Sequence, residues 1–237
     1  MFKLIPAICL ALVVSTSAFA KGPKNQYVRI KTAYGICIVR LYNETPLHRD
    51  NFVKLAREGS LNGTLFHRVI HDFMIQGGDP DSKSAKPGQA LGENSIGNDV
   101  PAEFKDSLFH KRGVIAAARD DKPAKSSSGS QFYLVQGKRF TDEELDRLEQ
   151  TRLKGRKIPV SQRDYYKSVG GVPHLDLNYT VFGEIVIGID MVERIAAVKT
   201  GANDRPEKDV PMTVELLTKK ECEQLDKIYP PHFLGQL

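Results

Sequence analysis

Short strand-like runs, separated by glycine-rich or polar loops, recur along almost the whole chain. Apolar residues alternate or cluster within each run, which is typical of β-strands rather than of helices. A chain with many short strands and few helices can bury its apolar residues inside a closed barrel. The runs cover residues 28–32, 36–42, 65–70, 74–76, 113–118, 131–136, 180–186 and 212–217.

Only two stretches predict helices that pack on this sheet. The first begins at Thr45-Pro46, where Thr45 is a candidate cap and Pro46 suits the first helical position, and it ends at Gly59. The second covers residues 190–198, whose apolar positions share one face. We therefore predict a mainly-β fold: a closed antiparallel barrel of eight strands, with one helix over each open end.

Residues 138–172 interrupt the strand pattern and predict a helical insertion. Thr141 and Glu144 have the spacing of a capping box, and Phe140 and Leu145 that of a hydrophobic staple. Because the rest of this predicted helix is charged, we expect it to lie on the outside of the barrel. Strands continue on both sides of it, so residues 21–237 are interpreted as one domain, with a C-terminal extension over about 219–237.

The N-terminus predicts export. Lys3 precedes an apolar run over residues 4–14, and Ala18-Phe19-Ala20 is a small-x-small cleavage site. This pattern is typical of a signal peptide, residues 1–20, cleaved after Ala20. We expect a periplasmic or secreted protein without stable membrane insertion after cleavage; the alternative is a retained N-terminal anchor. The C-terminus carries no endoplasmic reticulum retention signal.

Charge and cysteine content bear on the partners of the protein and on its disulfides. The 237 residues include 34 basic and 29 acidic side chains, a net charge of +5 that removal of Lys3 lowers by one. The basic residues are scattered among acids, so no nucleic-acid partner is predicted, and a monomer is expected. Cleavage would also remove Cys9 and leave Cys37 and Cys222, either as one disulfide or as two separate thiols.

The densest run of candidate chemistry covers residues 66–79. If its first five residues form a strand, alternation places Phe66 and Arg68 on the same face. The following turn would return Phe73 to Arg68, with Gln76 within hydrogen-bonding reach of the guanidinium. A donor fork beside an apolar floor suits a neutral substrate with a carbonyl and a compact apolar ring. The alternative is an arginine paired with an acid on the barrel surface.

Other chemistries find less support. His67 and His71 are four residues apart, but no Glu follows His67 and the segment predicts a strand, so no metal site is predicted.

Further candidate residues for a groove lie in two later strands. Residues 116–118 are three alanines, which could wall a groove or pack against a helix. Gln131 can donate and accept, as recognition of a peptide backbone requires. Phe132 and Tyr133 point to opposite faces, one toward the core and the other able to line a pocket.

These stretches resemble the signatures of the cyclophilin-type peptidyl-prolyl cis-trans isomerases. The most specific is Phe66-His67-Arg68 followed by Phe73-Met74-Ile75-Gln76-Gly77-Gly78-Asp79. Gly129-Ser130-Gln131-Phe132-Tyr133 and Leu175-Asp176 with Val181-Phe182-Gly183 resemble two further signatures. The order and spacing agree over about residues 28–217. The insertion and the run Gly170–Asp176 resemble exported bacterial members.

The resemblance implies an isomerase that rotates X-Pro bonds and assists the folding of exported proteins. Its partners would be proline-containing peptides and unfolded or folding exported proteins, and no cofactor or metal is implied. The alternative is a barrel that binds proline peptides, or acts as a chaperone, without turnover. Arg68 and Gln76 are implied to be catalytic. Substrate contacts are implied for His67, Phe73, Met74, Ala118, Arg119, Gln131, Phe132, Tyr133, His174, Leu175 and Tyr179.

Three departures from the family pattern bear on specificity. His174 stands where many eukaryotic members have Trp, which implies weak binding of cyclosporin. Tyr133 replaces the commoner Phe and adds a hydroxyl at the expected pocket floor. The insertion lies between the second and third signatures, where it could overhang the groove.

Overall fold

The structure is a computed structural model that describes residues 25–229. The predicted signal peptide lies outside these residues. Every predicted strand is confirmed within one or two residues at each end. The strands are β1 (Gln26–Thr32), β2 (Gly35–Leu41), β3 (Phe66–Ile70), β4 (Met74–Gly77), β5 (Val114–Ala117), β6 (Phe132–Val135), β7 (Val181–Ile187) and β8 (Thr213–Leu216).

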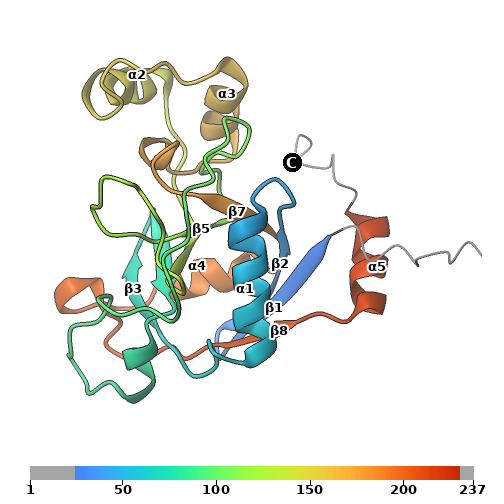
Figure 1. The fold of residues 1–237 in the computed structure, drawn as a ribbon. Helices are drawn as coiled ribbons and strands as arrows, with labels where there is room; N and C mark the ends of the chain where they lie inside the picture. The colour runs from blue at the N-terminus through green and yellow to red at the C-terminus, as the bar shows by residue number, and fades with distance from the viewer. Residues whose placement is uncertain (1–24, 230–237) are drawn as a thin grey trace, which may run out of the picture.

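The eight strands form one curled antiparallel sheet in the order β3-β4-β6-β5-β7-β2-β1-β8 (Figure 1). The predicted mainly-β fold of eight antiparallel strands is therefore confirmed. The two outer strands, β3 and β8, share no ladder in the described part of the chain. An isolated bridge between Leu65 and Pro211 links the residues that precede them. Closure of the sheet into a complete barrel stays a prediction.

Helices α1 (Pro46–Glu58) and α4 (Asp190–Ala196) contribute their apolar faces to the main core. Gly59 ends α1 in the left-handed conformation, as predicted. The predicted capping role of Thr45 is wrong, since its side chain accepts no hydrogen bond at the helix start. The carboxylate of Glu103 instead accepts from the backbone N–H groups of Leu47 and His48 at 3.1 and 3.0 Å. A distant loop therefore supplies the cap.

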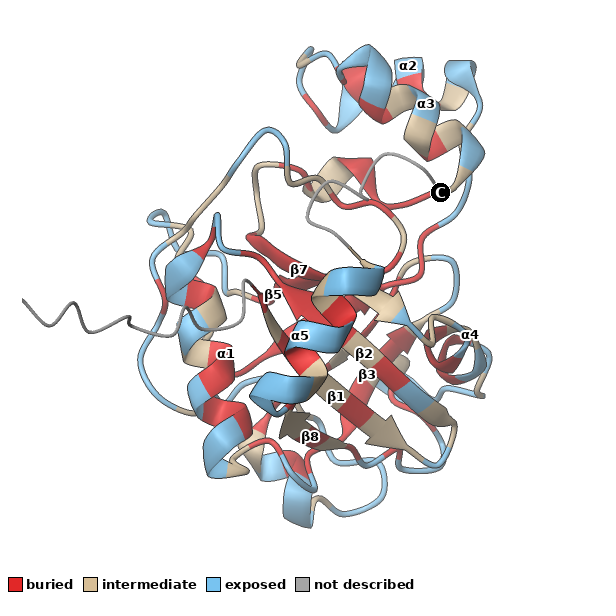
Figure 2. Ribbon diagram, turned by 90° about the vertical axis from the view of Figure 1, so that its right-hand side faces the viewer, coloured by how far each residue is buried: buried red, intermediate tan, exposed pale blue. Residues whose placement is uncertain are grey.

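Aromatic side chains dominate the middle of the main core, which lies between the sheet and α1. The ring of Phe52 meets Phe132 edge-on at 5.2 Å and Phe182 at 5.4 Å. Phe66 meets the other edge of this group, with its ring 6.1 Å from that of Phe132. Such tilted and edge-on pairs are favourable beyond the area that they bury. Figure 2 shows this burial as red on the strands and on the inner face of α1.

The insertion between β6 and β7 contains two helices, α2 (Asp142–Thr151) and α3 (Val160–Ser168), which project from one end of the sheet (Figure 1). The capping box of Thr141 and Glu144 is confirmed. Helix α3 was not predicted, because residues 160–168 are mostly polar and lack an apolar stripe. It owes its place to Tyr166, which is fully buried against Leu145 in a small separate core.

A further helix, α5 (Lys219–Ile228), follows the last strand and was also not predicted. Thr218 and Glu221 cap it, and Leu225 packs with Tyr27 of β1 on the outside of the sheet (Figure 2). Cys222 lies in this outer cluster, whereas Cys37 lies in the main core, and both are free thiols. The disulfide alternative is therefore wrong for this structure.

Three short 3₁₀ helices complete the described elements: η1 (Pro80–Ser84), η2 (Pro173–Leu175) and η3 (Ala202–Asp204). Within residues 25–229, no helix combines the length and the hydropathy needed to cross a bilayer. Leu175 of η2 lines a cavity on the sheet, and Asp204 of η3 pairs with Arg68 at the edge of that cavity.

We predict that Gly78→Ala destabilises the fold much more than Gly88→Ala. Both glycines have positive φ, +96° and +75°, so both substitutions strain the backbone by about 1 kcal/mol. A Cβ on Gly78 would lie 2.2 Å from the carbonyl oxygen of Ser130, whereas nothing lies within 4 Å of one on Gly88. Urea unfolding should show a loss at Gly78 that exceeds the loss at Gly88 by about 2 kcal/mol or more. Equal losses would contradict the close approach of these two loops.

Candidate active site

The hairpin of β3 and β4 carries the first group of predicted site residues. Arg68 pairs with Gln76 across the hairpin, and Ile70 pairs with Met74 next to the turn. The register shifts between Phe66 and Arg68, as at a β-bulge. Because of this shift, Phe66 enters the main core while Arg68 faces outward. The prediction that these two side chains share a face is therefore wrong.

A cavity of about 280 Å³ lies against the outer face of this hairpin. Most of the predicted site residues line it: His67, Arg68, Phe73, Met74, Gln76, Ala118, Arg119, Tyr133, Leu175 and Tyr179. The structure adds Leu91 and Gly92. They belong to a long loop without strand or helix signals, so the sequence pattern could not place them. Asp79 holds this loop by accepting a hydrogen bond from the Gly92 N–H at 2.6 Å.

Arg68 lies at the edge of this cavity with its side chain 41% exposed. Its Nε is 3.4 Å from Oδ2 of Asp204, whose side chain is 46% exposed. Both alternatives left open by the sequence are therefore present: the guanidinium has an acidic partner, and it lies beside a cavity whose lining includes apolar side chains. An ion pair this exposed contributes little stability. The guanidinium can therefore exchange this contact for a substrate at small cost.

The prediction that the side chain of Gln76 holds Arg68 is wrong, whereas a contact of Gln76 with substrate stays a prediction, since Gln76 lines the cavity. Its side-chain amide donates to Oε1 of Gln131 at 3.0 Å instead. Gln131 in turn donates to the carbonyl oxygens of Gly92 and Asn94, both at 2.8 Å. Gln131 is buried and does not line the cavity. These two glutamines, which we call the glutamine buttress, hold the loop of Gly92 and Asn94 in place along the cavity.

Two other predicted contacts lie away from the cavity. The side chain of Phe132 is 1% exposed and packs in the main core, so its predicted contact with substrate is wrong. Tyr133, the next residue along β6, takes the outward face and lines the cavity, as alternation allows. His174 stacks on Phe73 with ring centroids 5.7 Å apart, behind the cavity rather than in it.

The hydroxyl of Tyr133 points away from the cavity, into a buried chain of hydrogen bonds. It lies 2.9 Å from Nε2 of His110, and Nδ1 of His110 lies 2.9 Å from Oδ1 of Asp176. Tyr166 of the insertion donates to Oδ2 of the same carboxylate at 2.7 Å. Because a carboxylate can only accept, Nδ1 of His110 donates to it, which leaves Nε2 to accept from Tyr133. The chain therefore connects the cavity floor to the insertion.

Two histidines have uncharged rings, His67 in the cavity lining and His174 behind Phe73. Burial lowers the pKa of His67 to about 4. Burial, and then the nearby positive charge of Arg152, lower the pKa of His174 to about 4. Both rings are therefore neutral at pH 7. The positive charge along the cavity comes from Arg68 and from Arg119, which lies over the ring of Tyr179 at 4.7 Å.

A curled antiparallel sheet with an arginine beside a partly apolar cavity on its outer face agrees with what the resemblance implied. Residues 27–215 match the family described as "Cyclophilin type peptidyl-prolyl cis-trans isomerase/CLD". The chain belongs to this family.

Curated relatives carry the same activity in their names. A putative peptidyl-prolyl cis-trans isomerase of Staphylococcus aureus is 38% identical, over 71% of this chain and 79% of its own length. One from Staphylococcus saprophyticus is 36% identical, over 68% and 75%. A putative bifunctional phosphatase/peptidyl-prolyl cis-trans isomerase of Streptococcus pyogenes is 38% identical over 80% of this chain, which spans only 37% of that protein.

Solved structures agree on the fold. The crystal structure of a Cryptosporidium parvum cyclophilin type peptidyl-prolyl cis-trans isomerase superposes with a TM-score of 0.61. The match covers 82% of this chain and 98% of the other, at 22% sequence identity.

We predict that acid destabilises the protein between about pH 6.5 and pH 4 through its buried histidines. Folding lowers the pKa values of both histidines, so in this range the unfolded chain binds more protons than the folded one. The free energy of unfolding therefore decreases as the pH is lowered from about 6.5 to 4. His174→Phe keeps a flat ring on Phe73 and removes one of these groups. Chemical denaturation at several pH values should give a shallower slope for this variant, and an unchanged slope would contradict the assignment.

Proposed function

We propose that the cavity beside Arg68 binds the proline of a polypeptide and that this site catalyses rotation about the preceding peptide bond. The observation that carries the proposal is the exposed guanidinium at the edge of a cavity that has an apolar wall. Phe73, Met74 and Leu175 supply an apolar wall that suits the uncharged proline ring. Membership of the isomerase family supports the same reaction.

The chemistry of rotation needs a placed hydrogen-bond donor and no covalent intermediate. The barrier of about 18–20 kcal/mol arises because the C–N bond has partial double-bond character. In the twisted state the proline nitrogen regains a lone pair, which can accept a hydrogen bond. Arg68 would donate to this nitrogen and stabilise the twisted state more than either planar state. The glutamine buttress keeps the loop of Gly92 and Asn94 in place along the cavity, so that the bound bond stays close to the guanidinium.

The polypeptides on which the enzyme acts are proposed to be exported proteins during folding. This proposal rests on the N-terminal pattern of Lys3, the apolar run and the Ala18-Phe19-Ala20 site. Prolyl isomerisation is slow enough to limit folding, with uncatalysed times of tens of seconds or more. An isomerase in the same compartment would shorten this step.

We also propose that the sheet closes into a complete barrel. The bridge between Leu65 and Pro211 supports closure. Phe66 donates its N–H to the carbonyl oxygen of Val210, and Met212 donates to that of Thr64, both at 2.9 Å. Slow amide exchange at Phe66 and Met212, comparable with that of the interior strands, is the expected sign of a closed barrel.

Arg68→Ala is predicted to lower kcat/KM for a short X-Pro peptide several tens-fold, with the fold intact. A thirtyfold loss corresponds to about 2 kcal/mol of transition-state stabilisation. Arg68→Lys keeps the charge but not the planar donor fork, so its activity should fall in between. The matched control is Arg57→Ala, at an exposed position on α1. Near-full activity in a folded Arg68→Ala protein would rule out this mechanism, and peptide binding without turnover in the wild type would favour the non-catalytic alternative.

Export is tested separately by expressing the full chain in a Gram-negative host and fractionating the cells. The predicted product lies in the periplasmic fraction and has Lys21 as its first residue. Replacing Leu10 and Leu12 within the apolar run by Asp should keep the chain in the cytoplasm at full length. Wild-type protein that remains in the cytoplasm with Met1 would contradict the proposal.

A further inference from the structure

A second cavity lies next to the cavity beside Arg68, at the turn of the β3–β4 hairpin. Its volume is about 360 Å³, and we call it the insertion pocket. Phe73 lines both cavities, and its stacking partner His174 lines the insertion pocket. Phe140 and Leu148 of the insertion supply the far wall. The candidate active site therefore continues directly onto a surface that the inserted helices build.

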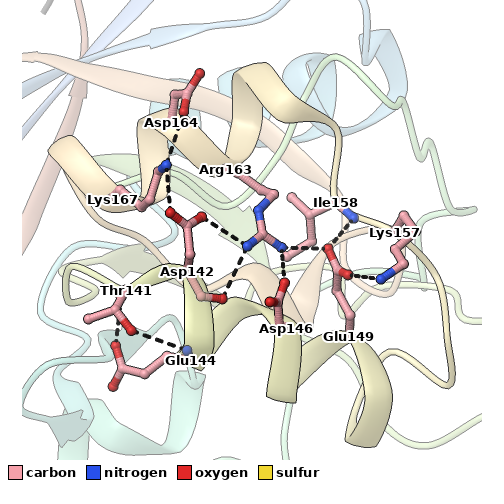
Figure 3. A network of polar contacts seen from close by, with 10 residues as sticks. All are labelled: Thr141, Asp142, Glu144, Asp146, Glu149, Lys157, Ile158, Arg163, Asp164 and Lys167. Carbon is pink, nitrogen blue, oxygen red and sulfur yellow. Dashed lines mark hydrogen bonds and ion pairs between the residues drawn. The ribbon is translucent and has the colours of Figure 1, made fainter.

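The inserted helices are held firmly enough to act as a fixed wall. The carboxylate of Glu149 is 2% exposed and accepts from the Ile158 N–H and from Arg163, both at 3.0 Å. Arg163 also pairs with Asp142 and Asp146, each at 2.9 Å, so that it ties α3 to α2 (Figure 3). A wall ordered before binding loses little conformational entropy when a ligand arrives.

The lining and the rim of the insertion pocket indicate what it would bind. Phe73, Phe140 and Leu148 make most of it apolar, and the His174 ring is neutral at pH 7. Lys138 on the rim is paired with Glu144, and Asp72 lies 3.4 Å from His71. Arg152 is exposed and has no ion pair with any residue from 25 to 229. The pocket therefore suits a large apolar side chain, with an acidic group next to it.

The path of a bound polypeptide follows from the proposed function. The rotating X-Pro bond lies beside Arg68, which pairs with Gln76 away from the hairpin turn. The residue before proline therefore occupies that end of the groove. The chain after proline leaves across Phe73, toward the turn and the insertion pocket. Because Phe73 lines both cavities, the first or second residue after a proline that lies against Phe73 is placed at the insertion pocket.

We propose that the insertion pocket is a specificity site for the polypeptide segment after the proline. It takes a large apolar side chain from the first or second residue after proline, and Arg152 favours an acidic residue beyond it. This inference rests on the proposed isomerase function. It assigns the insertion to the selection of substrates rather than to the rotation step itself.

The test measures kcat/KM of the mature protein for peptides that share one X-Pro core. Leu replaces Ala at the first or second position after proline, or, as a control, two positions before it. We expect about tenfold preference for Leu at one of the positions after proline, the usual gain from one well-placed apolar side chain. Leu148→Ala should reduce this preference to about twofold without changing the response to Leu before proline. The ratio is the readout, so a general loss of activity does not imitate the effect.

Matched variants distinguish a specific role of the insertion pocket from a general effect of changing the inserted helices. Val160→Ala, at an exposed position on α3, should leave the preference unchanged. Arg152→Gln should remove the added gain from a Glu placed after the apolar residue. No preference in the wild type, or a preference that Leu148→Ala leaves intact in a folded protein, would overturn the proposal. If no peptide is isomerised, the proposed function fails, and the dissociation constants of the same peptides then decide whether the pocket binds them.

Discussion

The carboxylate of Asp176 is the contact on which the arrangement of the cavity and the insertion depends. It accepts from the backbone N–H of His110 at 2.7 Å, from the His110 ring and from the Tyr166 hydroxyl. All of these groups are buried, so removing the carboxylate would leave three donors without water or another acceptor. Asp176 directly follows Leu175, which lines the cavity beside Arg68. The side chain of Asp176 therefore helps to position both Leu175 in the cavity wall and Tyr166 in the inserted helices.

The cavity beside Arg68 combines a floor that is fixed by the sheet with a cation that is exposed to solvent. Strands β3, β4 and β6 position the apolar floor, because Gln76 pairs with both Arg68 and Tyr133 across adjacent ladders. The cation is left at the edge, where its weak pairing with Asp204 does not hold it in one place. Such a site places a hydrogen-bond donor beside apolar side chains, and a bound polypeptide that displaces water there would strengthen a hydrogen bond to the developing lone pair.

The strands were predictable because two-residue periodicity and turn residues are local signals, and the signature around Arg68 identified most of the cavity. The errors arose where tertiary contacts decide the outcome. A bulge reversed the facing of Phe66, and the glutamine buttress took Gln76 away from Arg68. Helix α3 depends on burial of Tyr166 against a neighbouring helix. Leu91 and Gly92 reach the site through a hydrogen bond to Asp79, which no local pattern reveals.

A specificity site after the proline would also influence how the bond rotates. Rotation about X-Pro turns the chain before the proline relative to the chain after it. If the side chain after proline is anchored in the insertion pocket and the proline ring lies against Phe73, the carboxyl side of the bond is fixed. The residue before proline then has to turn, at the open end of the groove near Arg68. Contacts made by the anchored side persist in the transition state, so their binding energy helps to orient the bond against the guanidinium. An insertion outside the curled sheet can in this way raise kcat/KM for selected polypeptides without touching the rotating bond.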